Sequence, residues 1–447
     1  MSVALPFDPN MAAYDLGPIH PLKPERVTLA IDLMRAYGLV AEGPDRTADR
    51  DSGDVGLTRR ADVIAPLELP EADLHLVHEP AYIAAVKDAS ADPVGFRPRR
   101  GIGPGDTPPF PGMHAASLLV CGGTAAGLDA VLDGSYVRTF AVAGGLHHAH
   151  RDRASGFCVY NDPAVAIARA TRDRPGLRVA YLDIDAHHGD GVEEAFENRP
   201  DVLTVSLHET GLYLYPGTGF AVDIGTGEGA GFAINVPMPP GADDGCYDLA
   251  FEQVVEPVLK AFAPDVIVAQ LGADGHRDDP LTQLGLSVAG HQALVKRIIS
   301  LADLLCEGRL ATTGGGGYDT FSAVPRIWTC ALAELLGVKL EETLPANWRA
   351  TAALAAERPV PRALHEEHTE NHSSSTRVHL LTETERVIAR VRQVSPLLRG
   401  WGASAQGGTK RHASRIALRC ARASGSAFSS AAQKCTEWSW RTRWTSS

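Results

Sequence analysis

The hydrophobic pattern of the chain consists of short aliphatic runs separated by longer stretches with helical spacing. Runs of about four to eight residues rich in Val, Ile, Leu and Ala, without alternating polar positions, are typical of strands buried on both faces. Such runs predict strands over residues 137–143, 177–184, 202–207, 265–271 and 309–313.

The stretches between these runs have the apolar spacing of helices. They predict helices over residues 115–132, 163–172, 246–262, 288–306 and 322–337. Strands that alternate with helices indicate the α/β class, so we expect a single doubly wound domain with a mostly parallel central β-sheet flanked by helices. We expect this catalytic domain over residues 1–350 and a C-terminal extension of it over residues 351–399.

The last part of the chain, residues 400–447, has a different composition. It holds eight Lys and Arg against the single acid Glu437, and four of the six tryptophans. A basic segment with aromatic residues can contact nucleic acid. Because no apolar period is visible, we instead expect a basic, poorly ordered tail and no nucleic-acid partner.

Polar side chains follow each of the five predicted strands. Because the carboxyl ends of parallel strands meet at one edge of a sheet, these side chains are expected to converge on one crevice. The segments concerned are GGLHHAH (144–150), DIDAHHGDG (183–191), SLH (206–208), LGAD (271–274) and GGGGY (314–318).

Three of these side chains form a candidate metal site. Asp185 and His187 are two residues apart at a strand end, which places both on the same side of an extended chain. Asp274 ends another strand and completes a nitrogen and oxygen ligand set with a position open for water, as catalytic zinc requires. Ferrous iron could occupy the same ligands.

The neighbouring histidines are candidates for proton transfer. His147 and His148 can both face the crevice at a strand-to-loop bend, and Asp183 and Asp190 are carboxylates that can fix their tautomers. Tyr318 follows four glycines and can donate a hydrogen bond to an oxyanion.

Composition limits the other possibilities. A chain of 447 residues with 44% hydrophobic residues can bury a large core. The seven cysteines are scattered and form no C-x-x-C pair, so neither a disulfide framework nor a thiolate zinc site is indicated. The N-terminus has no secretory signal and no window approaches the roughly 18 apolar residues of a membrane helix. We therefore expect a cytoplasmic protein without a membrane partner; the oligomeric state is left open.

Taken in order along the chain, these motifs resemble those of the histone deacetylase family, and within it the bacterial acetoin-utilization type, over about residues 1–350. The motifs are HPLKPERV (20–27), GGLHHAH, SGFCVYND (155–162), DIDAHHGDGVEEAF (183–196), VSLHE (205–209), YPGTG (215–219), GADGH (272–276) and GGGGY.

The resemblance implies a role for each matching residue. It implies one zinc ion held by Asp185, His187 and Asp274, with Tyr318 as the transition-state tyrosine and His147 and His148 as the active-site pair. It further implies an acetyl-lysine tunnel, a substrate-gripping rim aspartate, an internal-cavity arginine and a structural potassium ion. The tunnel would be lined by Gly156, Phe157 and Tyr215, with Leu281 at its rim. The rim aspartate is Asp106, and the internal-cavity arginine is Arg26. The potassium ligands would be Asp183, Asp185 and Ser206, with the carbonyls of His187 and Leu207.

The expected reaction is hydrolysis of the acetyl amide of lysine in proteins. Zinc and the histidine pair would activate a water that attacks the acetyl carbonyl, and zinc with the Tyr318 hydroxyl would stabilise the oxyanion. His148 is expected to act as general base and then general acid, and His147, held by Asp183, to act electrostatically.

Three alternatives remain at this point. A binuclear urea hydrolase of the arginase type would need a carboxylate where Gly189 stands and another where His276 stands. A non-catalytic acyl-lysine-binding protein is opposed by the intact histidines and tyrosine. Acetylpolyamine hydrolysis uses nearly the same amide, and only Arg97, Arg99 and Arg100 in the 90–112 segment favour a protein substrate over a polycation.

Overall fold

The computed structural model describes residues 2–41, 59–356, 359–367 and 372–399. Within them, eight parallel strands form one sheet in the order β2-β1-β3-β8-β7-β4-β5-β6. The strands are β1 (Val3–Pro6), β2 (Asp62–Ile64), β3 (Arg138–Ala141), β4 (Val179–Asp183), β5 (Val202–Glu209), β6 (Ala233–Met238), β7 (Val266–Gln270) and β8 (Leu310–Thr313).

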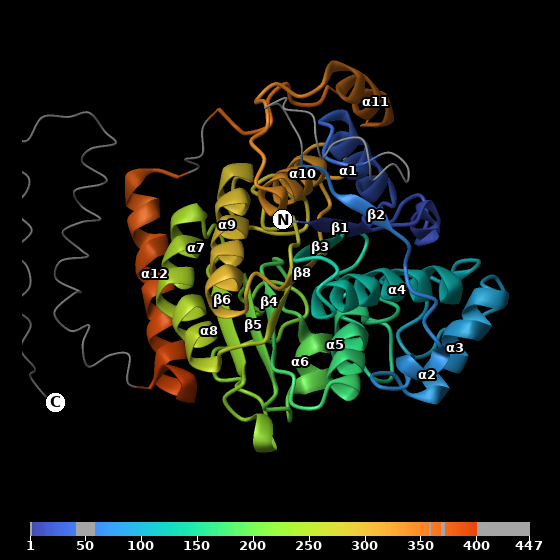
Figure 1. The fold of residues 1–447 in the computed structure, drawn as a ribbon, viewed down its shortest axis with the longest axis horizontal. Helices are drawn as coiled ribbons and strands as arrows, with labels where there is room; N and C mark the ends of the chain where they lie inside the picture. Colours follow the sequence, from blue (N-terminus) through green and yellow to red (C-terminus); the bar gives the residue numbers. More distant parts are fainter. Residues whose placement is uncertain (1, 42–58, 357–358, 368–371, 400–447) are drawn as a thin grey trace, which may run out of the picture. The chain divides into compact units, whose positions relative to one another are not determined.

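Helices cover the sheet in two groups (Figure 1). One group packs as a row of α1 (Glu25–Ala36), α10 (Ala323–Leu336), α9 (Val288–Leu305), α7 (Asp244–Ala250), α8 (Glu256–Phe262) and α12 (Ser374–Val394). The other consists of α2 (Glu71–Leu74), α3 (Pro80–Ala91), α4 (Met113–Leu132), α5 (Asp162–Asp173) and α6 (Asp190–Phe196). The doubly wound α/β class expected from the sequence is confirmed.

The five strands predicted from the sequence are the adjacent strands β3, β8, β7, β4 and β5 at the centre of the sheet. Every residue of these five strands is buried, and their sequences are mostly continuous aliphatic runs. The three missed strands are β2 and its neighbour β1 at one side of the sheet and β6 at the other. Among them β6 contains Pro237, and an edge strand tolerates a proline because one side of it has no ladder to complete.

The prediction that no segment could cross a membrane by length and composition was wrong for α4. This helix has 20 residues and a mean hydropathy of 1.6 in its most apolar window. That window is 72% buried, and α4 packs against β1, β3, β8 and α5. It is apolar on all sides because it is surrounded by protein.

The described chain through Leu398 forms one compact unit. Within it, α11 (Ala346–Ala356) contacts α1, and α12 packs on α7 and β6. The five cysteines in the described part are buried and unbridged. The prediction for the tail over 400–447 falls outside the described residues.

Candidate active site

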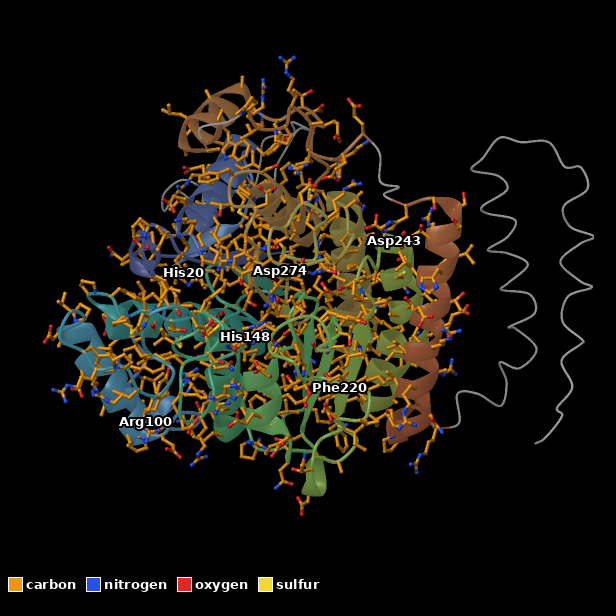
Figure 2. The ribbon with its side chains drawn as sticks, turned by 180° about the vertical axis from the view of Figure 1, so that it is seen from behind. His20, Arg100, His148, Phe220, Asp243 and Asp274 are labelled. Atoms are coloured by element: carbon orange, nitrogen blue, oxygen red, sulfur yellow. The ribbon has the colours of Figure 1, made fainter. Side chains whose placement is uncertain are left out.

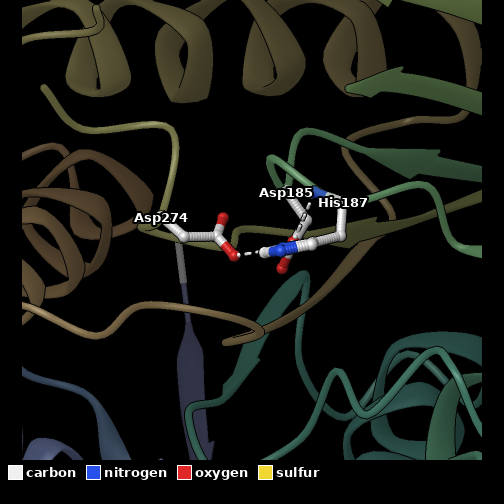
Figure 3. A group of neighbouring side chains, drawn as sticks. All are labelled: Asp185, His187 and Asp274. Carbon is white, nitrogen blue, oxygen red and sulfur yellow. Dashed lines mark hydrogen bonds and ion pairs between the residues drawn. The ribbon is translucent and has the colours of Figure 1, made fainter. Parts of the chain in front are cut away.

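The three predicted metal ligands lie together at the carboxyl ends of neighbouring strands (Figure 3). Asp185 and His187 come from the turn after β4, and Asp274 comes from the segment after β7. Their ligand atoms lie within 4.8 Å of one another, and all three residues are buried. The Nδ1 of His187 is 3.0 Å from Oδ2 of Asp274 and 3.3 Å from Oδ1 of Asp185.

The electrostatics of this cluster suit a cation. Burial and the charge of Asp185 together raise the pKa of Asp274 above its ordinary value. Burial alone would lower the pKa of His187, but the hydrogen bonds and charges of Asp185 and Asp274 outweigh it and raise this pKa to about 10. Two buried carboxylates facing one imidazole therefore need positive charge between them, and the donor set fits a single zinc or ferrous ion.

Backbone and side-chain donors orient the carboxylates from outside the cluster. The Oδ2 of Asp185 accepts hydrogen bonds from Gln270 Nε2 and from the Gly316 amide, each at 2.7 Å. The Oδ1 of Asp274 accepts one from the Ala186 amide at 2.8 Å. Gln270, the last residue of β7, was not anticipated from the sequence, because an amide inside an apolar run gives no sign of what it will face.

Each member of the histidine pair has its own carboxylate. The Nδ1 of His147 is 2.8 Å from Asp183, and the Nδ1 of His148 is 2.7 Å from Asp190. The two Nε2 atoms are 3.1 Å apart, so the imidazoles turn their Nε2 atoms toward each other. Figure 2 labels His148 and Asp274. Asp190 is also the first residue of α6, and its Oδ1 accepts the Gly191 amide, so it serves the helix start and the imidazole together.

The pKa values of the two imidazoles are shifted in opposite directions. For His147 burial is outweighed by Asp183 and Asp185, and the pKa rises to about 9. For His148, burial and the charge of His147 outweigh Asp190 and lower the pKa to about 4. At neutral pH the arrangement therefore holds one protonated and one neutral imidazole side by side.

Two further residues extend this network and were missed by the sequence reasoning. Tyr181 donates its hydroxyl to Asp183 at 2.7 Å. The imidazole of His150 lies between Asp190, 3.2 Å away, and Glu194. Their positions in the sequence could have indicated these roles. His150 is the third histidine of GGLHHAH, and Tyr181 lies two residues before Asp183.

Tyr318 lies beside the cluster, at the end of the glycine turn 314–317. Its ring centroid is 6.3 Å from that of His187 and 5.8 Å from that of Phe157. Burial, with the charges of Asp274 and Asp185, raises the pKa of Tyr318 well above its usual value, so the hydroxyl keeps its proton. A small cavity beneath is lined by Arg26, whose Nη1 donates to the Gly315 carbonyl at 2.5 Å.

The predicted tunnel residues surround the approach to this site. Gly156 and Phe157 line the cavity, both with positive φ, and a Cβ at Gly156 would come within 2.3 Å of the His148 ring. Tyr215 packs edge-on against His148 at 5.2 Å and is 43% exposed. Leu281 is 37% exposed, as a rim position requires. Asp106 is exposed, and its carbonyl faces His20 Nε2 at 3.1 Å.

The positions that a second metal would use are already occupied. A Cβ at Gly189 would lie 2.6 Å from Asp183 Oδ2, so a carboxylate there would displace the partner of His147. The Nε2 of His276 is 2.9 Å from Glu366, and its Nδ1 accepts the Asp278 amide. Both nitrogens of His276 are therefore engaged away from the cluster.

The predicted potassium ligands are adjacent in the sheet. Asp183 and Ser206 are paired across β4 and β5, and Leu207 follows Ser206 in β5. The Ser206 hydroxyl is 2.8 Å from His208 Nδ1. The potassium site stays a prediction.

Comparison with known proteins matches this arrangement to one family. The histone deacetylase domain family matches residues 20–335. The acetoin utilization protein AcuC of Bacillus subtilis is 38% identical over 344 residues, which cover 76% of this chain and 84% of that protein. AcuC of Staphylococcus xylosus is 34% identical over 66% of this chain and 77% of its own length.

Solved structures agree. The chain is similar to an HDAC homolog from Aquifex aeolicus, with a TM-score of 0.71 and 29% identity over 88% of this chain and all of that one. A structure of an HDAC homolog complexed with SAHA gives a TM-score of 0.72 at 30% identity, over 86% of this chain and all of the other. The chain belongs to the histone deacetylase family and is a deacetylase hydrolase.

Proposed function

We propose that this deacetylase hydrolyses the acetyl amide of acetyl-lysine in proteins with one zinc ion. The observation that carries the proposal is the buried Asp185, His187 and Asp274 cluster with His147 and His148 beside it, each imidazole bonded to its own carboxylate. Tyr318, Phe157 and Tyr215 supply the donor and the aromatic walls that an extended acyl-lysine side chain needs.

Asp185, His187 and Asp274 would hold the ion. When bound, zinc supplies a Lewis acid that polarises the acetyl carbonyl and makes a water molecule more acidic. Ferrous iron suits the same ligands, so the identity of the ion as zinc is part of the proposal. Potassium would be held by Asp183, Asp185 and Ser206, with the carbonyls of His187 and Leu207.

The chain's own groups carry the proton transfers. His148 is neutral, so its Nε2 can accept a proton from the attacking water and then donate it to the leaving amine. His147 is held by Asp183 as a cation and stabilises developing negative charge. The Tyr318 hydroxyl keeps its proton and can donate it in a hydrogen bond to the oxyanion of the acetyl carbon.

Protein substrates are favoured by the open surface beside the site. A groove of about 610 Å³ runs past Tyr215 and would leave room for a peptide chain. Asp106 is exposed at the rim and can accept hydrogen bonds from a peptide backbone. The proposal places the enzyme in the cytoplasm, with acetylated proteins as substrates and no membrane or nucleic-acid partner.

Acetylpolyamine is retained as a second substrate because the rim is less repulsive to cations than its arginines indicate. Arg99 is paired with Asp88 at 2.6 Å, and Arg100 is 3.7 Å from Glu79. The groove beside Tyr215 is lined by acids, namely Asp190, Glu193, Glu194, Glu197 and Asp223.

One assay separates these functions. Acetyl-lysine peptide and N-acetylputrescine are offered to the purified enzyme at equal concentrations, with and without a chelator. The proposal expects a higher kcat/KM for the peptide and loss of both activities on chelation. A higher kcat/KM for the diamine would indicate that acetylated polyamines are the substrates. Binding of the peptide without turnover would indicate an acyl-lysine-binding protein.

A further inference from the structure

The rim of the site and the glycine turn that carries Tyr318 are joined by one buried carboxylate. Asp279 lies in the rim loop, residues 275–284, and is 7% exposed. Its Oδ2 accepts the amide of Tyr318 at 2.8 Å, and its Oδ1 accepts the amide of Leu281 at 2.9 Å. One side chain thus holds both the tyrosine and the rim leucine.

The glycine turn depends on such contacts because four glycines have little stiffness of their own. Gly315 and Gly317 have φ values of +148° and +142°, which other residues rarely adopt. Arg26 holds the carbonyl of Gly315, and Asp185 holds the amide of Gly316. At Tyr318 itself, the backbone amide donates its hydrogen bond to Asp279.

The rim loop is a firm support for this contact. The Asp279 amide donates to the His276 carbonyl at 2.9 Å, and the Thr282 hydroxyl donates to the Asp274 carbonyl at 2.6 Å. At the far end of the loop, the Gln283 amide donates to Glu209 Oε2 at 2.8 Å. A loop tied at both ends can fix the position of Asp279 and, through it, that of Tyr318.

We propose that Asp279 is a positioning residue that sets the place of Tyr318 relative to the reacting carbonyl and couples it to the rim leucine Leu281. The inference rests on the proposed oxyanion role of Tyr318. An error of about 1 Å in the position of a donor can cost about 100-fold in rate, so a remote carboxylate can control turnover without touching substrate.

The test is Asp279→Asn alone and in a Tyr318→Phe background. The asparagine oxygen can accept only one of the two amides, and its NH₂ group faces the other. We expect kcat to fall about 10- to 100-fold with KM changed by less than about threefold. In the Tyr318→Phe background the same substitution should cost almost nothing, because the hydroxyl that it misplaces is already absent.

Glu209→Gln is the matched control. Glu209 is also a buried carboxylate that holds the rim loop, but it accepts the amide of Gln283 and not that of Tyr318. The fold-decreases in kcat caused by Glu209→Gln and by Tyr318→Phe should multiply in the double variant. If the Asp279→Asn cost is equally large in the presence and absence of the Tyr318 hydroxyl, the positioning role is wrong.

A second measurement does not depend on turnover. Hydrogen exchange of the Tyr318 amide in the metal-loaded enzyme should become about tenfold faster or more in Asp279→Asn, because a hydrogen bond to a charged acceptor is lost. Amides of β8 should exchange as in the wild type. Should Asp279→Asn fail to fold, Asp279→Ala gives the same comparison without a new donor. Unchanged Tyr318 exchange would overturn the inference, whereas an inactive wild type would overturn the proposed function alone.

Discussion

Tyr318 is the residue whose chemistry is most easily isolated, because its hydroxyl is the only group that phenylalanine lacks. We expect Tyr318→Phe to lower kcat by about 10²- to 10³-fold, the usual cost of losing one oxyanion donor, with little change in KM. Steady-state kinetics on an acetyl-lysine peptide measure it. Tyr213→Phe, at a tyrosine that is 71% exposed, is the control and should be neutral. Near wild-type turnover in Tyr318→Phe would remove the tyrosine from the mechanism.

For single residues, the sequence could predict which side chains meet when they directly follow central strands. Asp185, His187 and Asp274 follow strands whose parallel arrangement could be predicted, so their meeting could be predicted too. Gln270 and Asp279 could not be found this way. Their roles come from neighbours that are distant along the chain, namely Asp185 for Gln270 and Tyr318 for Asp279.

At the scale of elements, the short segment 359–367 is anchored to the rest of the domain through Glu366. Its Oε1 is 2.9 Å from His276 Nε2 and 3.0 Å from Arg326 Nη1, and its Oε2 accepts the Val288 amide. Arg326 is 3% exposed, so without Glu366 its charge would be buried with less compensation.

We therefore expect Glu366→Ala to lower the free energy of unfolding by about 3 kcal/mol, as for other broken buried ion pairs. Denaturant unfolding of the metal-loaded protein measures this. Glu367→Ala, at the exposed neighbouring position, should change it by less than about 0.5 kcal/mol. Equal effects of the two substitutions would show that the segment is not anchored through Glu366.

Elements were predictable where local pattern and burial coincide. The central strands are mostly continuous apolar runs, α9 between β7 and β8 has one buried and one exposed face, and α10 after β8 is buried at nearly every residue. The edge strands β2 and β6 are short or interrupted by polar residues and proline, so their pairing is decided by the rest of the sheet. The helical segment 246–262 contains a π-helical turn over Phe251–Val255, which periodicity does not register.

At the scale of the whole molecule, buried neutral histidines link stability to pH. His78 is 1% exposed, accepts the Asn161 amide through Nε2, and pairs with the His150 carbonyl through Nδ1. Burial lowers the pKa of His78 from about 6.5 to about 4. The unfolded chain therefore binds a proton at this site more readily than the folded one, and the stability contributed above pH 6.5 is lost as pH falls towards 4.

A pH series on His78→Gln isolates this contribution. The free energy of unfolding of the wild type should exceed that of the variant at pH 7, and the difference should shrink by about 3 kcal/mol between pH 7 and pH 4. Chemical denaturation at each pH gives the two curves. A difference that stays constant, or grows as pH falls, would contradict the assigned neutral state of His78.

The central claim is a single-metal deacetylase, and metal titration of the chelator-stripped enzyme tests it most directly. Deacetylation of an acetyl-lysine peptide is followed as zinc is added, and bound metal is counted in the same samples. The structure predicts that activity is lost on stripping and reaches its maximum at one ion per chain, and that Asp274→Asn is not restored by zinc. Full activity without metal, or a maximum at two ions per chain, would contradict it.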